Sequence, residues 1–454
     1  MKIKKQIAVC VRKNIWILSL IGLLLLNRAA QAQQVIMSPP PSYTNQPVWQ
    51  QTQTNEFQVF APEEPGAAPQ QGQPFQYGPL IARPHLSYQF IYATGIQSSP
   101  GTNQNTVINE FSPGILFDLG THWTLDYTPT LIYYQNHNFK NEFNNAATLT
   151  GATSYEDWAL GLSQSYSSSS SPEAETGTQT DQQTYSTALT ASYAFNSKFS
   201  LDMSVSQDFS FVDNAFGSTN AVNNSQDTRD WATMEWLNYT FWPRLNAGIG
   251  AGAGYANVNT GPDQTDEQLQ GRVNWRTTDK ISFEVNAGFE DIQFLASGMS
   301  DLLNPTFGAA IQYQPFKDTQ ISLNASETTS ANSLSFQGFV INTNHISVVE
   351  ITQGGATENT SISCNLNQHL LEKLSLNLGV GYTKTKYTDS ISASVGSISQ
   401  NRVDDYSFFS ASLSRPFLKR GTLSATYQYS NNSSTAQGFS YSSSQIGLEI
   451  GYSY

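Results

Sequence analysis

Charged residues are scarce in this 454-residue sequence. Asp, Glu, Lys and Arg make up 13% of it, against about 25% in ordinary soluble domains. A soluble protein with so few charges risks aggregation, whereas a transmembrane β-barrel turns apolar side chains toward lipid and neutral polar ones toward its lumen. The formal net charge is −13. An acidic balance argues against a nucleic-acid partner, which needs a basic surface.

Residues for catalysis or metal binding are also few. No histidine has the spacing of a metal-binding motif, and no G-x-S-x-G nucleophile motif occurs. His137, expected at the outer end of a strand, is the nearest catalytic candidate, and we interpret it as a solvated loop residue. We therefore predict no enzyme activity, no cofactor and no metal site. The five histidines are His85, His122, His137, His345 and His369.

One long apolar run is present, at residues 15–26. It follows a basic stretch and precedes Ala30-Gln31-Ala32, a small-residue cleavage site, so residues 1–32 are predicted to be a secretory signal peptide. Twelve residues are too few to span a bilayer, which needs about 20. Cleavage removes six basic residues and Cys10, leaving a formal charge of −19 and one cysteine, Cys364. No intrachain disulfide can then form.

Residues 33–82 are rich in Pro and Gln, as in "APEEPGAAPQQGQPFQYGP". This composition predicts a disordered periplasmic segment. It is either a passive spacer or a docking arm for a periplasmic partner or the cell wall.

Residues 83–454 show a period of two. In "KFSLDMSVSQDFSF" the apolar residues alternate with Ser and Asp, and "KISFEVNAGF" and "LSLNLGVGYT" repeat the pattern. Successive strand side chains point to opposite faces, so each segment is a strand with one apolar face. No fixed repeat indicates a solenoid, and the polar face lacks the Lys and Glu of a soluble sandwich. An all-β, transmembrane, antiparallel up-and-down β-barrel is predicted.

The connections alternate in length. We identify eight short turns, such as "NSK" and "TTDK", separated by nine longer polar connections such as "SNNSSTAQGFS". They join 18 strands, with both chain ends on the short-turn side. The count of 18 includes a hairpin within residues 141–166, and without that hairpin the count is 16. Even strand numbers, short periplasmic turns and long outer loops are typical of bacterial outer-membrane barrels.

The alternation also predicts which charged residues face the lumen, where charge tunes selectivity. Acidic side chains predominate, which favours cations or neutral solutes over anions, although each residue alone could simply be solvated. The predicted lumen-lining residues are Asp126, Asp202, Asp208, Arg272, Arg276, Glu284, Glu290 and Glu449.

Two segments suggest a narrowing of the lumen. In "NAGIGAGAGYAN" the glycines Gly248, Gly250, Gly252 and Gly254 would face inward, either seating an inward loop or making room for a neighbouring strand's aromatic side chain or a sharp bend. Residues 330–355 are unusually apolar for a loop. They are either a constriction folded into the lumen or a hairpin projecting outward to a partner. The constriction residues would be Phe336, Phe339, Ile346 and Val348.

Aromatic residues gather near the expected strand ends, as the interfacial girdles of a barrel require. The final segment "QIGLEIGYSY" is predicted to close the barrel against "HLSYQFIYAT", because an open edge is not tolerated in lipid. Tyr452 and Tyr454 fit a C-terminal signal read by the outer-membrane assembly machinery, although Glu449 replaces a glycine usual in that signal.

Recurring hairpins such as "ALTASYAFNSKFSLDMSVSQDF" and "AAIQYQPFKDTQISLNAS" resemble the β-barrel porin 2 family of outer-membrane proteins over residues 85–454. The resemblance implies a barrel that completes an exopolysaccharide export route, and it transfers no functional residue.

The expected protein is thus a polar, mildly acidic passage for solute or polymer in the outer membrane of a Gram-negative-type bacterium. Expected partners are membrane lipid, the assembly machinery, exopolysaccharide and periplasmic export components. The alternative is a structural or adhesive surface barrel with a closed lumen and partner-binding outer loops.

Overall fold

The computed structural model describes residues 75–99, 101–170, 179, 181–212, 227–259, 263–295, 301–342, 345–370, 373–392, 402–436 and 438–453. Within these, the side chains of 330–356 and 388–392 are not described. The predicted signal peptide and most of the Pro/Gln-rich segment lie outside the described residues. Within the described part of the chain, no helix is long and apolar enough to cross a membrane.

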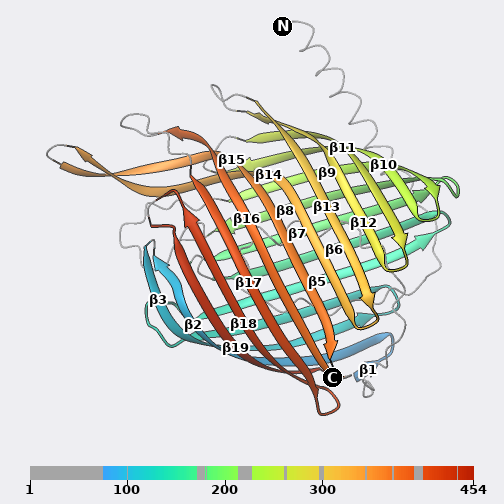
Figure 1. Ribbon diagram of the computed structural model, residues 1–454, viewed down its shortest axis with the longest axis horizontal. Helices are drawn as coiled ribbons and strands as arrows, with labels where there is room; N and C mark the ends of the chain where they lie inside the picture. Colours follow the sequence, from blue (N-terminus) through green and yellow to red (C-terminus); the bar gives the residue numbers. More distant parts are fainter. Residues whose placement is uncertain are drawn as a thin grey trace, which may run out of the picture.

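All regular structure in the described residues is β-strand (Figure 1). The strands are β1 Phe75–Tyr77, β2 Leu80–Ser99, β3 Thr102–Leu119, β4 Trp123–Tyr134, β5 Glu142–Tyr155, β6 Trp158–Ser169, β7 Gln182–Ala194, β8 Phe199–Val212, β9 Thr228–Trp242, β10 Leu245–Val258, β11 Gln264–Thr278, β12 Ile281–Phe294, β13 Leu302–Phe316, β14 Thr319–Asn342, β15 His345–Leu370, β16 Leu374–Ser392, β17 Val403–Phe417, β18 Gly421–Ser434 and β19 Tyr441–Ser453.

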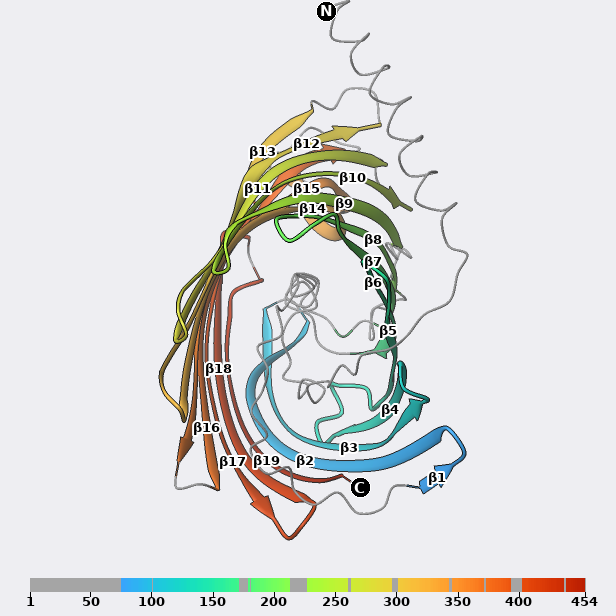
Figure 2. The same cartoon turned by 90° about the vertical axis from the view of Figure 1, so that its right-hand side faces the viewer.

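Strands β2 to β19 form one closed antiparallel barrel of 18 strands. Each pairs with the next along the chain, and β19 pairs with β2 from Ser444 opposite Thr94 to Ser453 opposite His85. Seen along its length, the barrel is a continuous wall around an interior (Figure 2). The predicted strand number is confirmed, including the β5–β6 hairpin, and so is closure against "HLSYQFIYAT".

The eight short connections fall where the sequence predicts them, and they share one end of the barrel with the C-terminus (Figure 1). Local chemistry explains their positions. In the β7–β8 turn the Asn196 side-chain oxygen accepts hydrogen bonds from the backbone N–H groups of Lys198 and Phe199, at 2.8 and 3.0 Å. Such Asx turns compete with the ladder and end strands. By the usual rule for outer-membrane barrels, this short-turn end faces the periplasm.

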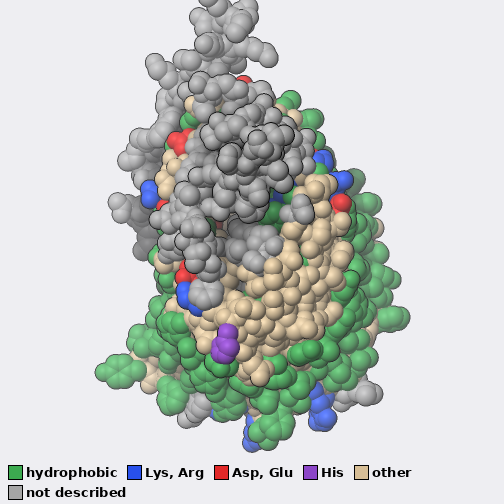
Figure 3. All heavy atoms as spheres, turned by 90° about the vertical axis from the view of Figure 1, so that its left-hand side faces the viewer, with side chains coloured by type: hydrophobic (Ala, Val, Ile, Leu, Met, Phe, Trp, Pro, Cys, Tyr) green, Lys and Arg blue, Asp and Glu red, His purple; other side chains and the backbone are tan. Residues whose placement is uncertain are grey.

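The outer surface of the barrel is apolar. Tyr88, Phe90 and Tyr92 of β2 are 42%, 40% and 47% exposed, whereas the intervening Ile91 and Ala93 are buried. Apolar side chains flank the barrel in the space-filling view, around a largely polar end face (Figure 3). An apolar exterior of this extent is stable only against lipid. The barrel therefore crosses a membrane.

The sheet begins at Phe75, earlier than the expected boundary at residue 83. β1 pairs with the first residues of β2, Phe75 lying opposite Ala82. β2 extends beyond the point where β19 ends, since the last pair of that seam involves His85. β1 thus covers an edge of β2 that would otherwise lack backbone partners.

Residues 330–342 and 345–355 form paired strand, which corrects the expectation of a loop there. β14 and β15 continue as one ladder as far as Asn342 opposite His345, and their hairpin runs past the ends of the neighbouring strands (Figure 1). The backbone matches the projecting hairpin, one of the two arrangements considered. The high content of β-branched residues is explained by strand propensity.

Candidate functional site: the inner wall of the barrel

The eight predicted lumen residues all lie on the face opposite the exposed apolar side chains. On β8, Phe199 and Val205 are outward and 42% and 46% exposed, so Asp202 and Asp208 point inward by the period of two. The same parity places Arg272 and Arg276 inward from β11, where Leu269 and Val273 are outward. It also places Asp126, Glu284, Glu290 and Glu449 inward.

Two of these residues, Asp202 and Arg272, meet in an ion pair although β9 and β10 lie between their strands. Asn238 of β9 bridges them: its amide nitrogen donates to Asp202 at 2.8 Å, and its oxygen accepts from Arg272 Nε at 3.0 Å. Ser192 of β7 donates a further hydrogen bond to Asp202 at 2.6 Å. The guanidinium carbon of Arg272 lies 4.5 Å from the ring centroid of Trp236. We call these five residues the Arg272 clamp.

The glycines of β10 make this arrangement possible. Gly248 lies opposite Arg272 on one side and opposite Asn238 on the other, so the arginine crosses β10 where no side chain blocks it. A Cβ at Gly250 would be 2.6 Å from the Trp236 ring. The glycine row therefore accommodates a neighbouring strand's inward aromatic, one of the readings considered, and in addition a long basic side chain.

A row of carboxylates lies between the Arg272 clamp and the outer end. Asp208 of β8 is directly opposite Asp230 of β9, and Asp230 lies within electrostatic reach of Asp266. Gln268 donates to Glu290 at 2.9 Å and to Asp266 at 3.3 Å. We call Asp208, Asp230, Asp266 and Glu290 the acidic row. Within the described residues no cluster of three or more His, Cys, Asp or Glu side chains could hold a metal ion.

An apolar cluster covers the inner wall on the other side, over β2, β3 and β4. Its members are buried although they point into the barrel. Phe139, from the connection between β4 and β5, folds inward and stacks on Tyr134, with ring centroids 5.3 Å apart. The other members are Ile91, Ala93, Ile108 and Ile132. Sequence reasoning missed this inward connection, whose one signal is a lone aromatic in the polar stretch "NHNFKN".

Polar contacts fasten the inward connection to the connection between β6 and β7. The Gln179 side chain accepts from Lys140 N at 2.8 Å and donates to Glu142 at 2.6 Å. Lys140 also pairs with Asp181 at 2.8 Å. Partial burial opposes ionisation of Asp181, but hydrogen bonds from Lys140 and Ser170 outweigh it and lower the pKa of this carboxyl. No sequence pattern marks Gln179.

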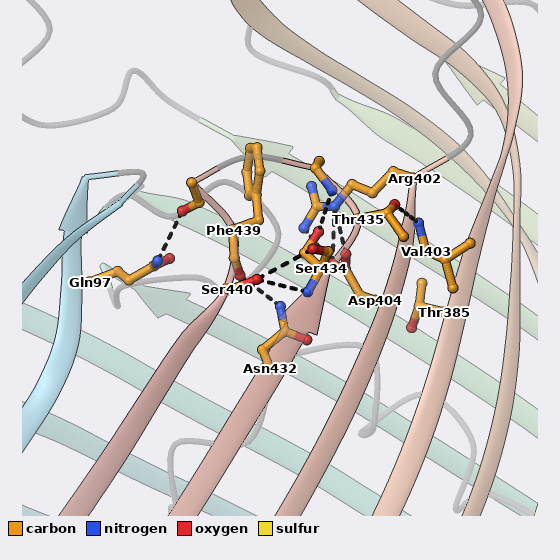
Figure 4. A network of polar contacts seen from close by, with 12 residues as sticks. Gln97, Thr385, Arg402, Val403, Asp404, Asn432, Ser434, Thr435, Phe439 and Ser440 are labelled. Atoms are coloured by element: carbon orange, nitrogen blue, oxygen red, sulfur yellow. Dashed lines mark hydrogen bonds and ion pairs between the residues drawn. The ribbon is translucent and has the colours of Figure 1, made fainter.

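A second cluster lies at the outer ends of β16 to β19 (Figure 4). Arg402 and Asp404 are almost fully buried, and they pair through two guanidinium nitrogens at 2.5 and 3.0 Å. The Arg402 guanidinium carbon lies 3.9 Å from the Phe439 ring centroid and 4.7 Å from that of Tyr387. We call these four residues the Arg402 clasp.

The Arg402 clasp continues into the closing seam of the barrel. Asn432 donates to the carbonyl of Phe439 in the β18–β19 connection at 2.9 Å, and this same connection is tied to the β2–β3 hairpin. There Gln97 and the Gly101 N–H both donate to the Gly438 carbonyl, at 3.0 and 2.7 Å.

The remaining predicted residues lie apart from these clusters. Asp126 accepts from Thr128 at 3.1 Å, and Thr128 contacts His85. His137 is exposed. Tyr452 points outward, 45% exposed, and Tyr454 lies outside the described residues, so their role in assembly stays a prediction. The side chains of Phe336, Phe339, Ile346 and Val348 are not described.

A closed antiparallel barrel with an apolar exterior and a polar inner wall defines the class: this chain is an outer-membrane β-barrel. No family model matches the sequence, and no curated protein matches it.

Solved structures resemble its fold. OccAB3 of Acinetobacter baumannii has a TM-score of 0.43 and 10% identity, covering 82% of this chain and 99% of that one. OccK2 (OpdF) of Pseudomonas aeruginosa has a TM-score of 0.44 and 10% identity, covering 82% of this chain and 98% of that one. The siderophore receptor PirA of A. baumannii has a TM-score of 0.42 and 8% identity, covering 81% of this chain and 80% of that one.

Proposed function

We propose that this barrel is a passage for polar solutes or polymer across the outer membrane, with neutral and cationic species favoured over anions. The observation that carries the proposal is the inner wall. Its side chains are mainly Ser, Thr, Asn, Gln and Gly. Arg272 on this wall is neutralised by Asp202, and the acidic row adds negative charge. Barrels of 16–18 strands are wide enough for an aqueous channel.

The inward connection between β4 and β5 narrows this passage on one side. Phe139 seats it on the apolar cluster, and Gln179 and Asp181 hold its far end. We assign to this segment the constricting role that was one of the two alternatives for residues 330–355, whose strands follow the other alternative, a projecting hairpin.

The substrate we favour is an exopolysaccharide or its fragments. A hydroxyl-rich chain exchanges hydrogen bonds readily with the small polar side chains and amides of this wall, and a neutral or weakly charged polymer meets no barrier from the acidic row. Liposome swelling tests this. Neutral oligosaccharides should enter faster than anionic ones of similar size, and equal exclusion of both would contradict the substrate.

Planar-bilayer recording of the purified protein tests the passage itself. Folded protein should give discrete conductance steps, and a salt gradient should give a reversal potential of the sign expected for cation preference. A silent bilayer, with barrel formation verified by heat-modifiable migration in gels, would sink the proposal.

A silent bilayer would favour the second candidate, a surface barrel with a closed lumen that binds partners. The projecting β14–β15 hairpin and the inward connections at the outer mouth support that role (Figure 1).

A further inference from the structure

Arg272 lies on the inner wall, on the short-turn side of the acidic row, where a free positive charge would strongly influence passing ions. Its side chain is only 15% exposed, as is that of Asp202. The guanidinium lies across the glycine strand β10, against Trp236 and between two acceptors. Its charge is thus balanced and its position held flat on the wall.

The acidic row has no such balance. Among the described residues, no salt bridge involves Asp208, Asp230, Asp266 or Glu290; their hydrogen-bond partners are neutral amides where they have any. Two populations of charge therefore share one wall: a neutralised pair on the short-turn side, and carboxylates without a cationic partner nearer the outer end, of which Glu290 is itself buried. The potential in the lumen depends on which of them faces the passing solute.

We propose that Asp202 and Asn238 set the ion selectivity of this barrel by clamping Arg272 against the wall, out of the path that the acidic row defines. The proposal rests on the proposed passage. Asp202 and Asn238 act through Arg272 and are positioning residues, and Arg272 is the specificity-determining charge. Released from the clamp, the long flexible side chain would extend into lumen water and offset the acidic row.

Reversal potentials of variants in a salt gradient test the clamp. Asp202→Asn removes the ionic partner and should lower the cation-to-anion permeability ratio by roughly twofold or more. Arg272→Gln should raise the ratio. Asn238→Ala leaves every charge in place yet removes the bridge, and it should lower the ratio in the same direction as Asp202→Asn, by less.

Two matched controls separate clamping from counting charges. Asp208→Asn removes an inward carboxylate that holds no arginine, so it should lower the ratio less than Asp202→Asn does. Asn286→Ala removes an inward amide that contacts Gln270, 3.2 Å away, and it should leave the ratio unchanged.

Each outcome decides the matter. Equal effects of Asp202→Asn and Asp208→Asn, with no effect of Asn238→Ala, would show that charge number alone matters and would overturn the clamp. Folded variants that no longer conduct would assign the residues a structural role and also overturn it. A silent wild type would refute the proposed passage and this inference with it, whereas a conducting wild type with immovable selectivity would refute the clamp alone.

Discussion

The two sides of the inner wall are built from the same alternating strands and differ in what points inward. Over β8 to β11 the inward residues include Gly248 and Gly250, so the wall is thin there. A polar side chain can lie along its inner surface across β10. Over β2 to β4 the inward residues include Ile91, Ile108, Ile132 and Tyr134, and the inward connection packs on these side chains. The period-two alternation explains why both sides form barrel strands. The size of the inward residues explains why the lumen is wider on one side than on the other.

The largest effect should come from removing the inward β4–β5 connection. Replacing residues 136–140 with two glycines eliminates Phe139 and its stacking on Tyr134, so single-channel conductance should rise by roughly half or more. Removing residues 333–352 from the projecting hairpin is the matched control and should leave conductance unchanged. The reverse pattern would return the constriction to the hairpin.

Breaking the Arg402 clasp tests whether the mouth depends on a buried charge. Arg402 and Asp404 side chains are 3% and 8% exposed, so Arg402→Met leaves Asp404 uncompensated and should cost about 3–5 kcal/mol. Urea unfolding in detergent measures the loss. Adding Asp404→Leu removes the stranded charge and should recover most of it; no recovery would show that the aromatic contacts carry the stability.

Thickening the thin side should have a moderate effect. Gly250→Val places methyl groups against the Trp236 ring, which a Cβ alone would approach to 2.6 Å, and overpacking of this kind costs about 1–3 kcal/mol. Gly271→Ala is the control, since its Cβ would meet nothing nearer than 3.9 Å. Equal unfolding free energies for the two variants would contradict the close approach.

The smallest effect concerns the ion pair between Lys140 and Asp181, which is more than 40% exposed and stabilises by at most about 1 kcal/mol. The pKa of Asp181 is lowered from its ordinary 3.8, so its contribution is present above that value and is lost as pH falls through the lowered pKa.

Hydrogen exchange of the 136–140 amides should therefore quicken as pH falls from 3.8 through the lowered pKa of Asp181, more in the wild type than in Asp181→Asn, once intrinsic rates are removed. Identical profiles for the two proteins would exclude this pair as a fastening of the inward connection.

The fold was largely predictable because its signals are local. Alternation marks the strands, and turn residues such as Asn196 mark where they end. The contacts inside the barrel could not be predicted from the sequence, since Asp202 and Arg272 are 70 residues apart in the chain. Parity places both inside the barrel, but only the register and the glycines of β10 bring them together. The apolar content of residues 330–355 fits either a constriction or a projecting hairpin, and only the continuing β14–β15 pairing distinguishes the two backbones.

The closing seam has a consequence for the kinetics of folding. Every other pair of neighbouring barrel strands is a hairpin that can form as soon as its two strands exist. Thr94 and Ser444, which meet where β2 and β19 join, are 350 residues apart. Pairing these two strands directly from the unfolded chain would have a larger loop-closure entropy cost than pairing any two consecutive strands. The strands can therefore pair one after another into an open sheet. The rate at which the barrel is completed then depends on the rate at which β2 and β19 pair.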